Sequence, residues 1–370
     1  METLKKKLII FMPSMEGGGV EKNTILITNY LANYINDIEF ITFDNKFNKY
    51  FDKKVRIINH VANSRIKRSK YYKYLMCLIL LVRSLTGNKK AYIFAFQANI
   101  YCIILSIILG KKLITRSNSS PSGWNKNIIK NFIFKILLKY PTRVIVNSKA
   151  FKREIDKKFN IDSKMIYNPL NKEEILAKSK EKLNDNFLKY KNSLKIINIS
   201  RFTSQKDHVT LLKAFKLVNK KILSKLILIG YGSNKNKIID FIKKNKLQNN
   251  VKIVNFTFNP FKYVAKCDLF ILTSIYEGLP NVILESMALK KYVISSKCPT
   301  GPSEILKGGK YGGLFPIKNY KKLSALIIDY FKNKKKYKKK IIDAYSSLKR
   351  FDQENNCKLY LIEILKLMKT

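Results

Sequence analysis

A helix that looks buried and yet carries carboxylates is the first feature of this sequence that suggests chemistry. The stretch YEGLPNVILESMAL, residues 276–289, is apolar nearly all round, which predicts a buried helix with Pro280 in its first turn. Glu285 lies in the middle of that helix and Glu277 lies just before it. A buried carboxylate needs a partner, which is either a ligand or a neighbouring backbone group or lysine. We favour a ligand.

Two cations on one loop suit a ligand that carries phosphate. Arg201 and Lys206 both lie in RFTSQKD. An arginine can grip phosphate oxygens through two hydrogen bonds and a lysine adds a mobile point charge, so the pair suits a diphosphate whose charge grows as it leaves. The alternative is an ordinary solvated loop in a very basic chain. Gly230 and Gly232, in LIGYGS, either let the backbone approach such a ligand or simply end a strand.

All of these segments follow predicted strands. Short β-branched runs at 194–200, 225–230, 250–256, 268–274 and 291–296 alternate with helical patterns, which predicts a parallel sheet covered on both faces. Because the carboxyl ends of parallel strands lie along one edge, we expect RFTSQKD, GYGS, YEGLPN and CPTGPSEIL to converge on one ligand crevice. The start of the carboxylate-bearing helix would present unpaired N–H groups there, which suits a diphosphate or a sugar oxygen without any metal.

The same alternation, less regular, runs through the first half of the chain. The strand candidates are KLIIFMPS, DIEFITF, AYIFAF, KKLITRS and TRVIVNS, and a Gly-rich turn with a helix from about 20 to 34 follows the first of them. We therefore predict an α/β fold of two Rossmann-like, doubly wound domains facing a central cleft. The first domain is expected at 1–170, a polar linker at 171–193, the second domain at 194–345, and at 346–370 a C-terminal helix that packs back toward the first domain.

The composition indicates a globular protein. Hydrophobic residues make up 46% of the chain, and no apolar run approaches the roughly 20 residues of a membrane span. The N-terminus lacks the long apolar stretch and cleavage site of a signal peptide and is expected to form a first strand. Five scattered cysteines without CxxC spacing indicate reduced thiols in the cytoplasm and argue against a zinc site. The net charge of +48 favours anionic partners, or reflects a general compositional bias.

These stretches together resemble a known enzyme family. EGLPNVILE is similar to the E-x7-E signature of the retaining GT-B glycosyltransferases of family 4 (glycosyl transferases group 1), which include bacterial surface-polysaccharide enzymes. ISRFTSQKDHVTLLKAF resembles that family's Arg-…-Gln-Lys-Asp segment, and LILIGYGS, CPTGPSEIL and GGLFP follow in the family's order. GGGVEK resembles its Gly-rich turn after the first strand. The resemblance covers most of the chain and is most specific in the second half.

The resemblance implies transfer of a sugar, an N-acetylhexosamine or a hexose, from a UDP-sugar with retention at the anomeric carbon. No nucleophile–base pair stands out, so we expect same-face transfer without a covalent intermediate. We expect no metal cofactor, because the sequence shows no Asp-x-Asp pair beside a strand end. The implied catalytic residues are Arg201, Lys206 and Glu277. The implied donor-binding residues are Gly18, Gly19, Gly230, Gly232, Gly278, Leu279, Pro280, Asn281 and Glu285, the last as the ribose contact.

On the acceptor side the sequence departs from the family pattern. Many relatives place a histidine after a strand comparable to KKLITRS, where this chain offers the acceptor-side candidates Arg116, Ser117, Asn118 and Ser119. Its two histidines, His60 and His208, lie elsewhere, and both are expected at the surface.

The acceptor class implied by the resemblance is a glycan or a polyprenyl-linked glycan. Residues 65–85, with a basic start and an apolar body, suit either an anionic membrane surface or a core helix with a solvated basic end. We therefore expect a cytoplasmic enzyme attached peripherally to the inner face of the plasma membrane. The alternatives are a nucleotide-sugar epimerase or hydrolase of the same fold and a basic nucleic-acid-binding protein, but no nucleic-acid-binding module appears and the E-x7-E segment favours transfer.

Overall fold

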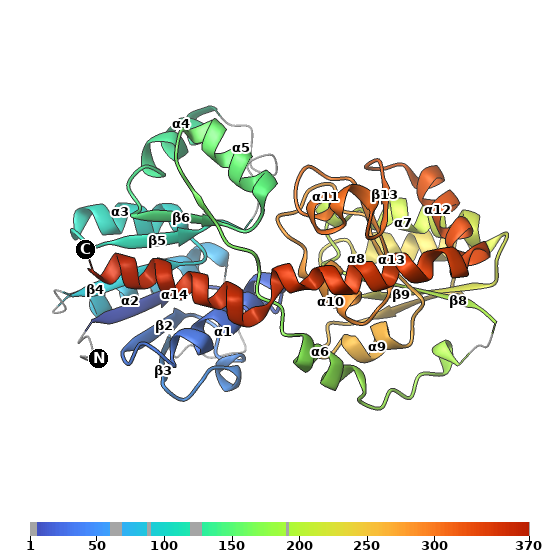
Figure 1. Cartoon of the computed structure of the whole chain (residues 1–370), viewed down its shortest axis with the longest axis horizontal. Coiled ribbons are helices and arrows are strands. Elements are labelled where there is room, and N and C mark those ends of the chain that lie inside the picture. The colour runs from blue at the N-terminus through green and yellow to red at the C-terminus, as the bar shows by residue number, and fades with distance from the viewer. Residues whose placement is uncertain (1–5, 60–68, 87–89, 119–127, 190–191, 370) are drawn as a thin grey trace. The chain divides into compact units, whose positions relative to one another are not determined.

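The chain forms two compact units, each with its own parallel sheet (Figure 1). The computed structural model describes residues 6–59, 69–86, 90–118, 128–189 and 192–369. Unit 1 comprises residues 1–169 together with 353–370, and unit 2 comprises residues 170–352. The chain therefore passes between the units twice.

The sheet of unit 1 has seven parallel strands in the order β3-β2-β1-β4-β5-β6-β7. Their bounds are β1 Lys7–Phe11, β2 Ile38–Thr42, β3 Val55–Asn59, β4 Ala91–Ala95, β5 Leu113–Arg116, β6 Arg143–Val146 and β7 Lys164–Met165. The strand order reverses direction between β1 and β4, which are hydrogen-bonded neighbours from Lys7↔Ala91 to Phe11↔Ala95.

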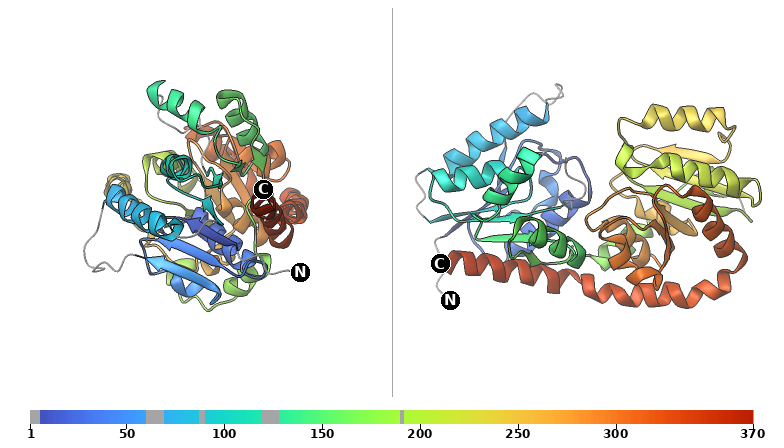
Figure 2. Two further views of the ribbon diagram at one scale, coloured as in Figure 1. Left: turned by 90° about the vertical axis from the view of Figure 1, so that its left-hand side faces the viewer. Right: turned by 90° about the horizontal axis from the view of Figure 1, so that it is seen from above.

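Helices cover both faces of this sheet. They are α1 Gly19–Leu31, α2 Lys70–Leu85, α3 Asn99–Ile108, α4 Ile128–Leu137, α5 Lys149–Phe159 and α14 Gln353–Lys369, with a short 3₁₀ turn, η1, at Asn48–Tyr50. Alternate residues of β1 face opposite ways: Leu8 and Ile10 pack with α1 and α14, and Ile9 and Phe11 pack with α2, α3 and α5. Figure 2 (right) shows α14 and α2 on opposite sides of the sheet. The sheet is thus buried on both faces, as its continuous apolar strands predict.

The sheet of unit 2 has six parallel strands in the order β10-β9-β8-β11-β12-β13. Their bounds are β8 Leu194–Ile199, β9 Ser224–Ile229, β10 Val251–Val254, β11 Leu269–Leu272, β12 Tyr292–Ser296 and β13 Gly313–Phe315. The order again reverses, here between β8 and β11. This is the strand order of a doubly wound Rossmann fold, repeated in both units.

The helices of unit 2 alternate with these strands. They are α6 Lys172–Ser179, α7 His208–Asn219, α8 Lys235–Lys244, α9 Phe261–Ala265, α10 Asn281–Ala288, α11 Pro302–Ile305, α12 Tyr320–Lys332 and α13 Lys334–Ser346. Short 3₁₀ turns lie at η3 Asn186–Leu188, η4 Ser204–Lys206, η5 Lys307–Gly309 and η6 Ser347–Phe351. In the described residues, no helix is both long and apolar enough to cross a membrane.

The structure gives residues 171–193, predicted as a linker, a place in unit 2. There α6 packs against α9, Asn259 donates to the carbonyl of Lys178 at 2.8 Å, and Asp185 accepts from Lys252 at 2.8 Å. Ile175 and Leu188, two apolar residues in this polar stretch, are buried. At the other end of the chain, the last helix begins at Gln353 rather than 346 and packs on α1 within unit 1.

Candidate active site at the carboxyl edge of the second sheet

The loops that carry the predicted site follow the two central strands of unit 2. In a doubly wound sheet the ligand crevice lies beyond the carboxyl ends of the strands, where the strand order reverses. That point lies between β8 and β11. The loop after β8 contains Lys206, and the loop after β11 contains Glu277. The two loops predicted to carry the charged groups therefore start at the position where this fold binds ligands.

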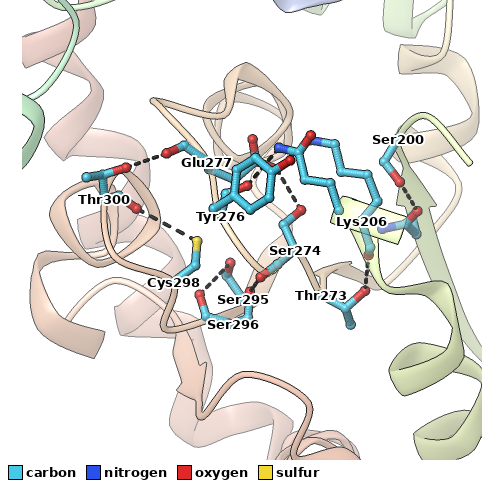
Figure 3. Close-up of polar contacts among 12 residues, drawn as sticks. Ser200, Lys206, Thr273, Ser274, Tyr276, Glu277, Ser295, Ser296, Cys298 and Thr300 are labelled. Atoms are coloured by element: carbon cyan, nitrogen blue, oxygen red, sulfur yellow. Dashed lines mark hydrogen bonds and ion pairs between the residues drawn. The ribbon is translucent and has the colours of Figure 1, made fainter. Parts of the chain in front are cut away.

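Lys206 and Glu277 form an ion pair across this point. The Lys206 Nζ lies 2.5 Å from Glu277 Oε1, and their side chains are only 14% and 9% exposed. Ser274 Oγ donates to the same carboxylate oxygen at 2.6 Å (Figure 3). An ammonium group has three N–H donors, so one carboxylate does not exhaust Lys206. The pair thus holds a largely buried ammonium group in place, and that ammonium has further N–H donors for a ligand.

Backbone contacts fix the two loops to each other. Thr273 Oγ1 donates to the carbonyl of Lys206 at 2.8 Å. Gln205 Nε2 donates to the carbonyl of Tyr276 at 2.8 Å, and the N–H of Ile275 donates back to the carbonyl of Gln205 at 2.8 Å. These bonds hold Lys206 and Glu277 in one rigid arrangement. Sequence reasoning missed the hydroxyls of Thr273 and Ser274, although two consecutive hydroxyl residues directly after an apolar strand were a visible signal.

The loop after β12 packs against the same site. Thr300 Oγ1 donates to the carbonyl of Glu277, and Ser296 Oγ donates to the carbonyl of Ser274 at 2.5 Å (Figure 3). Gly301 has φ +62°, and a Cβ on it would lie 2.0 Å from the carbonyl oxygen of Gly278. Only glycine permits this approach in this conformation. The segment CPTGPSEIL therefore reaches the site, as its place after a strand predicted.

The carboxylate-bearing helix is α10. It is buried from Ile283 to Ala288, which confirms the prediction of a buried helix, and Glu285 is 5% exposed. Pro280 is its N-cap, with ψ 108°, rather than a first-turn residue as predicted. The difference is one position, because the helical dihedrals start only at Asn281. The first N–H groups of a helix have no partner within it, and those of α10 begin four residues after Glu277 in the chain.

Gly230 and Gly232 serve contacts within the protein. A Cβ on Gly230 would lie 2.0 Å from the carbonyl oxygen of Ser200, and one on Gly232 would lie 2.5 Å from that of Phe202. The N–H of Phe202 donates to the carbonyl of Tyr231 at 2.6 Å. The close backbone approach seen here is therefore between the loops after β9 and β8. Arg201, on the latter loop, has an exposed side chain.

His208 lies inside unit 2 and not at the surface, contrary to the sequence-based expectation. It is 3% exposed at the start of α7, and its Nε2 lies 3.1 Å from Ser200 Oγ. Burial, and then the positive charge of Lys206, lower the pKa of His208 to about 4. The reason for the error is local: His208 looks polar in the sequence, but its ring packs edge-on against Phe202, 5.1 Å between centroids. His60 lies outside the described residues.

In unit 1, Gly18 and Gly19 lie after β1, beside the point where that sheet's strand order reverses. Gly18 is the N-cap of α1 and Gly19 its first residue. The side chain of Gln97, which follows β4, braces this turn from across the reversal point: its Nε2 donates to the carbonyl of Ser14 at 3.0 Å and its Oε1 accepts from the Ser14 N–H at 3.2 Å. Asp44 accepts from the N–H of Met15 at 2.9 Å. The Gly-rich turn is thus held by side chains from its neighbouring strands.

The acceptor-side candidates that the structure describes, Arg116, Ser117 and Asn118, are buried or half-buried within unit 1. Arg116 is completely buried, with Nε donating to the hydroxyl of Tyr360 at 2.8 Å and Nη2 to Asn168 at 2.6 Å. Its Nη1 donates to Asn118. A guanidinium without exposed surface cannot touch an acceptor, so we assign Arg116 to the packing of α14 on unit 1. Ser117 is buried too, and Ser119 lies outside the described residues.

The part of the chain that the structure describes contains no group of three or more His, Cys, Asp or Glu side chains placed to hold a metal ion. All five cysteines are buried free thiols. The charged groups of the predicted site at the carboxyl edge of unit 2 are the Lys206 ammonium, the Glu277 carboxylate and the exposed guanidinium of Arg201.

Comparisons with known proteins point to one family. Residues 179–347, all within unit 2, match the model of the family "Glycosyl transferases group 1". An uncharacterised glycosyltransferase of Methanocaldococcus jannaschii is 36% identical over 178 residues, which cover 47% of this chain and 44% of that relative. The N-acetylgalactosamine-N,N'-diacetylbacillosaminyl-diphospho-undecaprenol 4-alpha-N-acetylgalactosaminyltransferase of Campylobacter jejuni is 26% identical over 85% of this chain and 87% of its own length.

Solved structures share the fold over the whole chain. The Anabaena protein HepE, in a crystal structure with UDP and glucose, superposes with a TM-score of 0.79 at 19% identity and covers 98% of this chain and 100% of its own. Two Rossmann-like units with these strand orders form the GT-B fold. The second unit of the chain matches the group 1 glycosyltransferases in sequence, and the whole chain shares the GT-B fold.

Proposed function

We propose that this glycosyltransferase moves a sugar from a UDP-sugar to a glycan or lipid-linked glycan acceptor, with retention at the anomeric carbon, in the synthesis of a surface polysaccharide. The observation that carries the proposal is the Lys206–Glu277 pair, largely buried at the point where the strand order of unit 2 reverses. This position suits a nucleotide, and a fixed ammonium suits its diphosphate.

The residues at this edge divide between the parts of the donor. Lys206 and Arg201 would bind the diphosphate, with the first N–H groups of α10 as further donors. Glu277 would accept hydrogen bonds from hydroxyls of the transferred sugar, and Glu285 from the ribose. The backbone of Gly278, Leu279, Pro280 and Asn281 would lie along sugar and phosphates. Gly18 and Gly19 remain predicted donor-binding residues.

The chemistry follows from these charges. The bond between the anomeric carbon and the diphosphate oxygen breaks, the acceptor oxygen attacks from the same face, and its proton passes to the leaving diphosphate. Lys206 and Arg201 stabilise the negative charge that grows on the leaving group, and fixed charges of this kind are usually the largest single contribution to rate. Glu277, held by Lys206 and Ser274, orients the sugar and forms no covalent bond to it.

The relatives support the choice of donor and acceptor. HepE was crystallised with UDP and glucose, and the Campylobacter jejuni enzyme is named for a diphospho-undecaprenol acceptor and an N-acetylgalactosaminyl group. We therefore propose UDP as the nucleotide, an N-acetylhexosamine as the first sugar to test, and a polyprenyl-linked glycan as the first acceptor. Such an acceptor implies work at the inner face of the plasma membrane, on the cytoplasmic side.

The test is incubation with radiolabelled UDP-sugars, with and without a membrane extract that supplies lipid-linked glycans. We expect label to enter the lipid fraction only when extract is present, and to do so equally in EDTA, since no metal is assigned. Label released as free sugar without extract would indicate a hydrolase, and an epimerised UDP-sugar would indicate an epimerase. Either result, or no reaction of wild-type protein with any donor, contradicts the proposal.

A further inference from the structure

The outer layer of unit 1 carries apolar side chains on the side that should face water. The helices α2, α3 and α4 lie side by side, and α2 and α3 each bury one face against the sheet. Their opposite faces expose large hydrophobic side chains, among them Leu75, Ile108 (70% exposed) and Phe132 (63% exposed). The outer face of a helix in an α/β protein is ordinarily polar. This one is not.

A groove between two of these helices extends the apolar surface. It has a volume of about 510 Å³ and is lined by residues of α2 and α3, including Leu78, Val82, Ile104 and Leu105. Contiguous apolar surface of this kind on a soluble unit marks a binding surface rather than scattered exposed residues. We call the exposed sides of α2, α3 and α4, with this groove, the apolar face.

The charged residues on the helices of the apolar face are all positive, and one of them, Lys73 of α2, is paired with Asp44 at 2.7 Å. The sequence contains no Asp or Glu between Asp52 and Glu154, a stretch that includes all three helices. The exposed charged residues that the structure describes on or next to these helices are Lys70, Arg83, Lys135 and Lys139. A second copy of this chain would bring the same positive charges together and is disfavoured. Nucleic acid would match the charge but not the aliphatic side chains, which bind neither phosphate nor base edges.

We propose that the apolar face docks on an anionic lipid bilayer, with its hydrophobic side chains at the boundary between headgroups and acyl chains. Apolar side chains beside lysine and arginine are the pattern of surfaces that lie in a membrane interface. The sequence pointed to one segment, residues 65–85; the structure adds α3 and α4 and shows that α2 serves both the core and the exposed face. The proposal specifies the membrane setting of the proposed function and is independent of the donor and acceptor.

The experiment is flotation of the full-length protein with vesicles of two compositions: phosphatidylcholine alone, and phosphatidylcholine with about 30% phosphatidylglycerol, an anionic lipid. We expect binding to the anionic vesicles, weakened by high salt because screening removes the attraction to the headgroups. The variant Leu75→Gln/Ile108→Gln/Phe132→Gln is expected to lose at least tenfold in vesicle affinity. All three positions are exposed, so the fold should persist, which the melting temperature and its shift by UDP would verify.

Matched variants in unit 2 control for general effects. Leu223 and Ile342 are similarly exposed hydrophobic residues, and Leu223→Gln/Ile342→Gln should bind vesicles like wild type. Lys70→Gln/Lys135→Gln/Lys139→Gln should weaken binding more than the same change at Lys335, Lys338 and Lys339 of α13. No vesicle binding, binding unchanged in the apolar-face variant, or loss of a dimer instead of loss of vesicle binding would each overturn the proposal. UDP binding is measured on the same samples. Failure of the proposed donor would appear as loss of UDP binding, and failure of the membrane proposal would appear as loss of vesicle binding.

Discussion

At the scale of single residues, the site depends on how Lys206 is held. Its ammonium is largely buried against the carboxylate of Glu277, and a buried charge left without a partner costs several kcal/mol. In the proposed complex a diphosphate shares that ammonium, since Lys206 has three N–H donors. Two consecutive residues position the pair: the Thr273 hydroxyl holds the Lys206 backbone and the Ser274 hydroxyl holds the Glu277 carboxylate.

The hydroxyl of Ser274 can be tested alone. A hydrogen bond to a charged group is worth about 1.5–3 kcal/mol, so Ser274→Ala should lower kcat/KM by about tenfold or more, because the Glu277 carboxylate is no longer oriented. Ser324→Ala is the matched control, since that hydroxyl donates to the carbonyl of Lys321 within α12, away from the pair. Equal kinetics for the two variants would show that Ser274 does not position the site.

The neutral, buried His208 predicts a pH dependence of stability. Its folded-state pKa of about 4 lies below the ordinary 6.5, so between pH 6.5 and 4 the unfolded chain takes up a proton that the folded chain refuses. Stability therefore falls as the pH falls through this window, by roughly 3 kcal/mol in total from this group, and nothing is lost above pH 6.5. His208→Gln, which does not titrate, should show a smaller loss in urea unfolding at pH 6.5 and 5. Parallel curves for both proteins would contradict this.

The sequence identifies the charged residues of the site better than their partners. Lys206 and Glu277 are recognisable because each follows an apolar strand, and the fold brings such positions to one edge. The burial of His208 and the packing role of Arg116 are not recognisable. Both depend on side chains far along the chain or on another element, Tyr360 in the case of Arg116, and no local pattern carries that information.

At the scale of elements, loops after four strands of unit 2 interlock at one edge of its sheet. Strands rich in β-branched residues were predicted correctly, but β3, β7 and the three-residue β13 were not. In β7 only two residues are paired, too few for a periodic pattern, and in β3 Arg56 interrupts the apolar run. Close packing of these loops depends on glycine: because Gly301 has no Cβ, the loop after β12 can contact the backbone of Gly278.

Two glycines of similar backbone conformation allow the cost of a left-handed backbone to be distinguished from the cost of a steric clash. Gly301 and Gly308 have φ +62° and +63°, but a Cβ would strike the Gly278 carbonyl only at Gly301, and at Gly308 it meets nothing within 4 Å. Gly308→Ala should cost about 1–2 kcal/mol, the price of a left-handed alanine. Gly301→Ala should lower the free energy of unfolding by at least about 2 kcal/mol more, and should weaken UDP binding. Equal unfolding midpoints in urea would show that this contact does not constrain the loop.

At the scale of the whole molecule, each unit has its own core. The buried cluster of unit 2 lies entirely within residues 194–337, whereas one cluster of unit 1 combines the first strands with the last helix, through Tyr360, Ile364 and Leu367. The sequence predicted two domains and a returning C-terminal helix. It could not place the crossing points, because the polar stretch 171–193 contains the few apolar residues that anchor it in unit 2.

Removal of residues 353–370 should therefore affect the units unequally. The removed segment contributes five or more buried side chains to the core of unit 1. Burial of each stabilises the fold by about 1.5–3 kcal/mol, so their loss exceeds the free energy of unfolding of a unit of this size. Hydrogen exchange should show β1 and β4 unprotected and β8 and β11 still protected. Leu359→Gln, on the exposed side of α14, is the control and should leave both protected. Protection lost in both units, or in neither, would contradict two separate cores.

The most direct test of the account is calorimetric titration of UDP into wild type, Lys206→Ala and Lys243→Ala. Lys243 is an exposed lysine in the last turn of α8 and controls for net charge. The account predicts that wild type and Lys243→Ala bind UDP alike and that Lys206→Ala binds at least tenfold more weakly, because a charge-assisted hydrogen bond to the diphosphate is lost. Undiminished binding of UDP by Lys206→Ala, in a protein that melts like wild type, would contradict it.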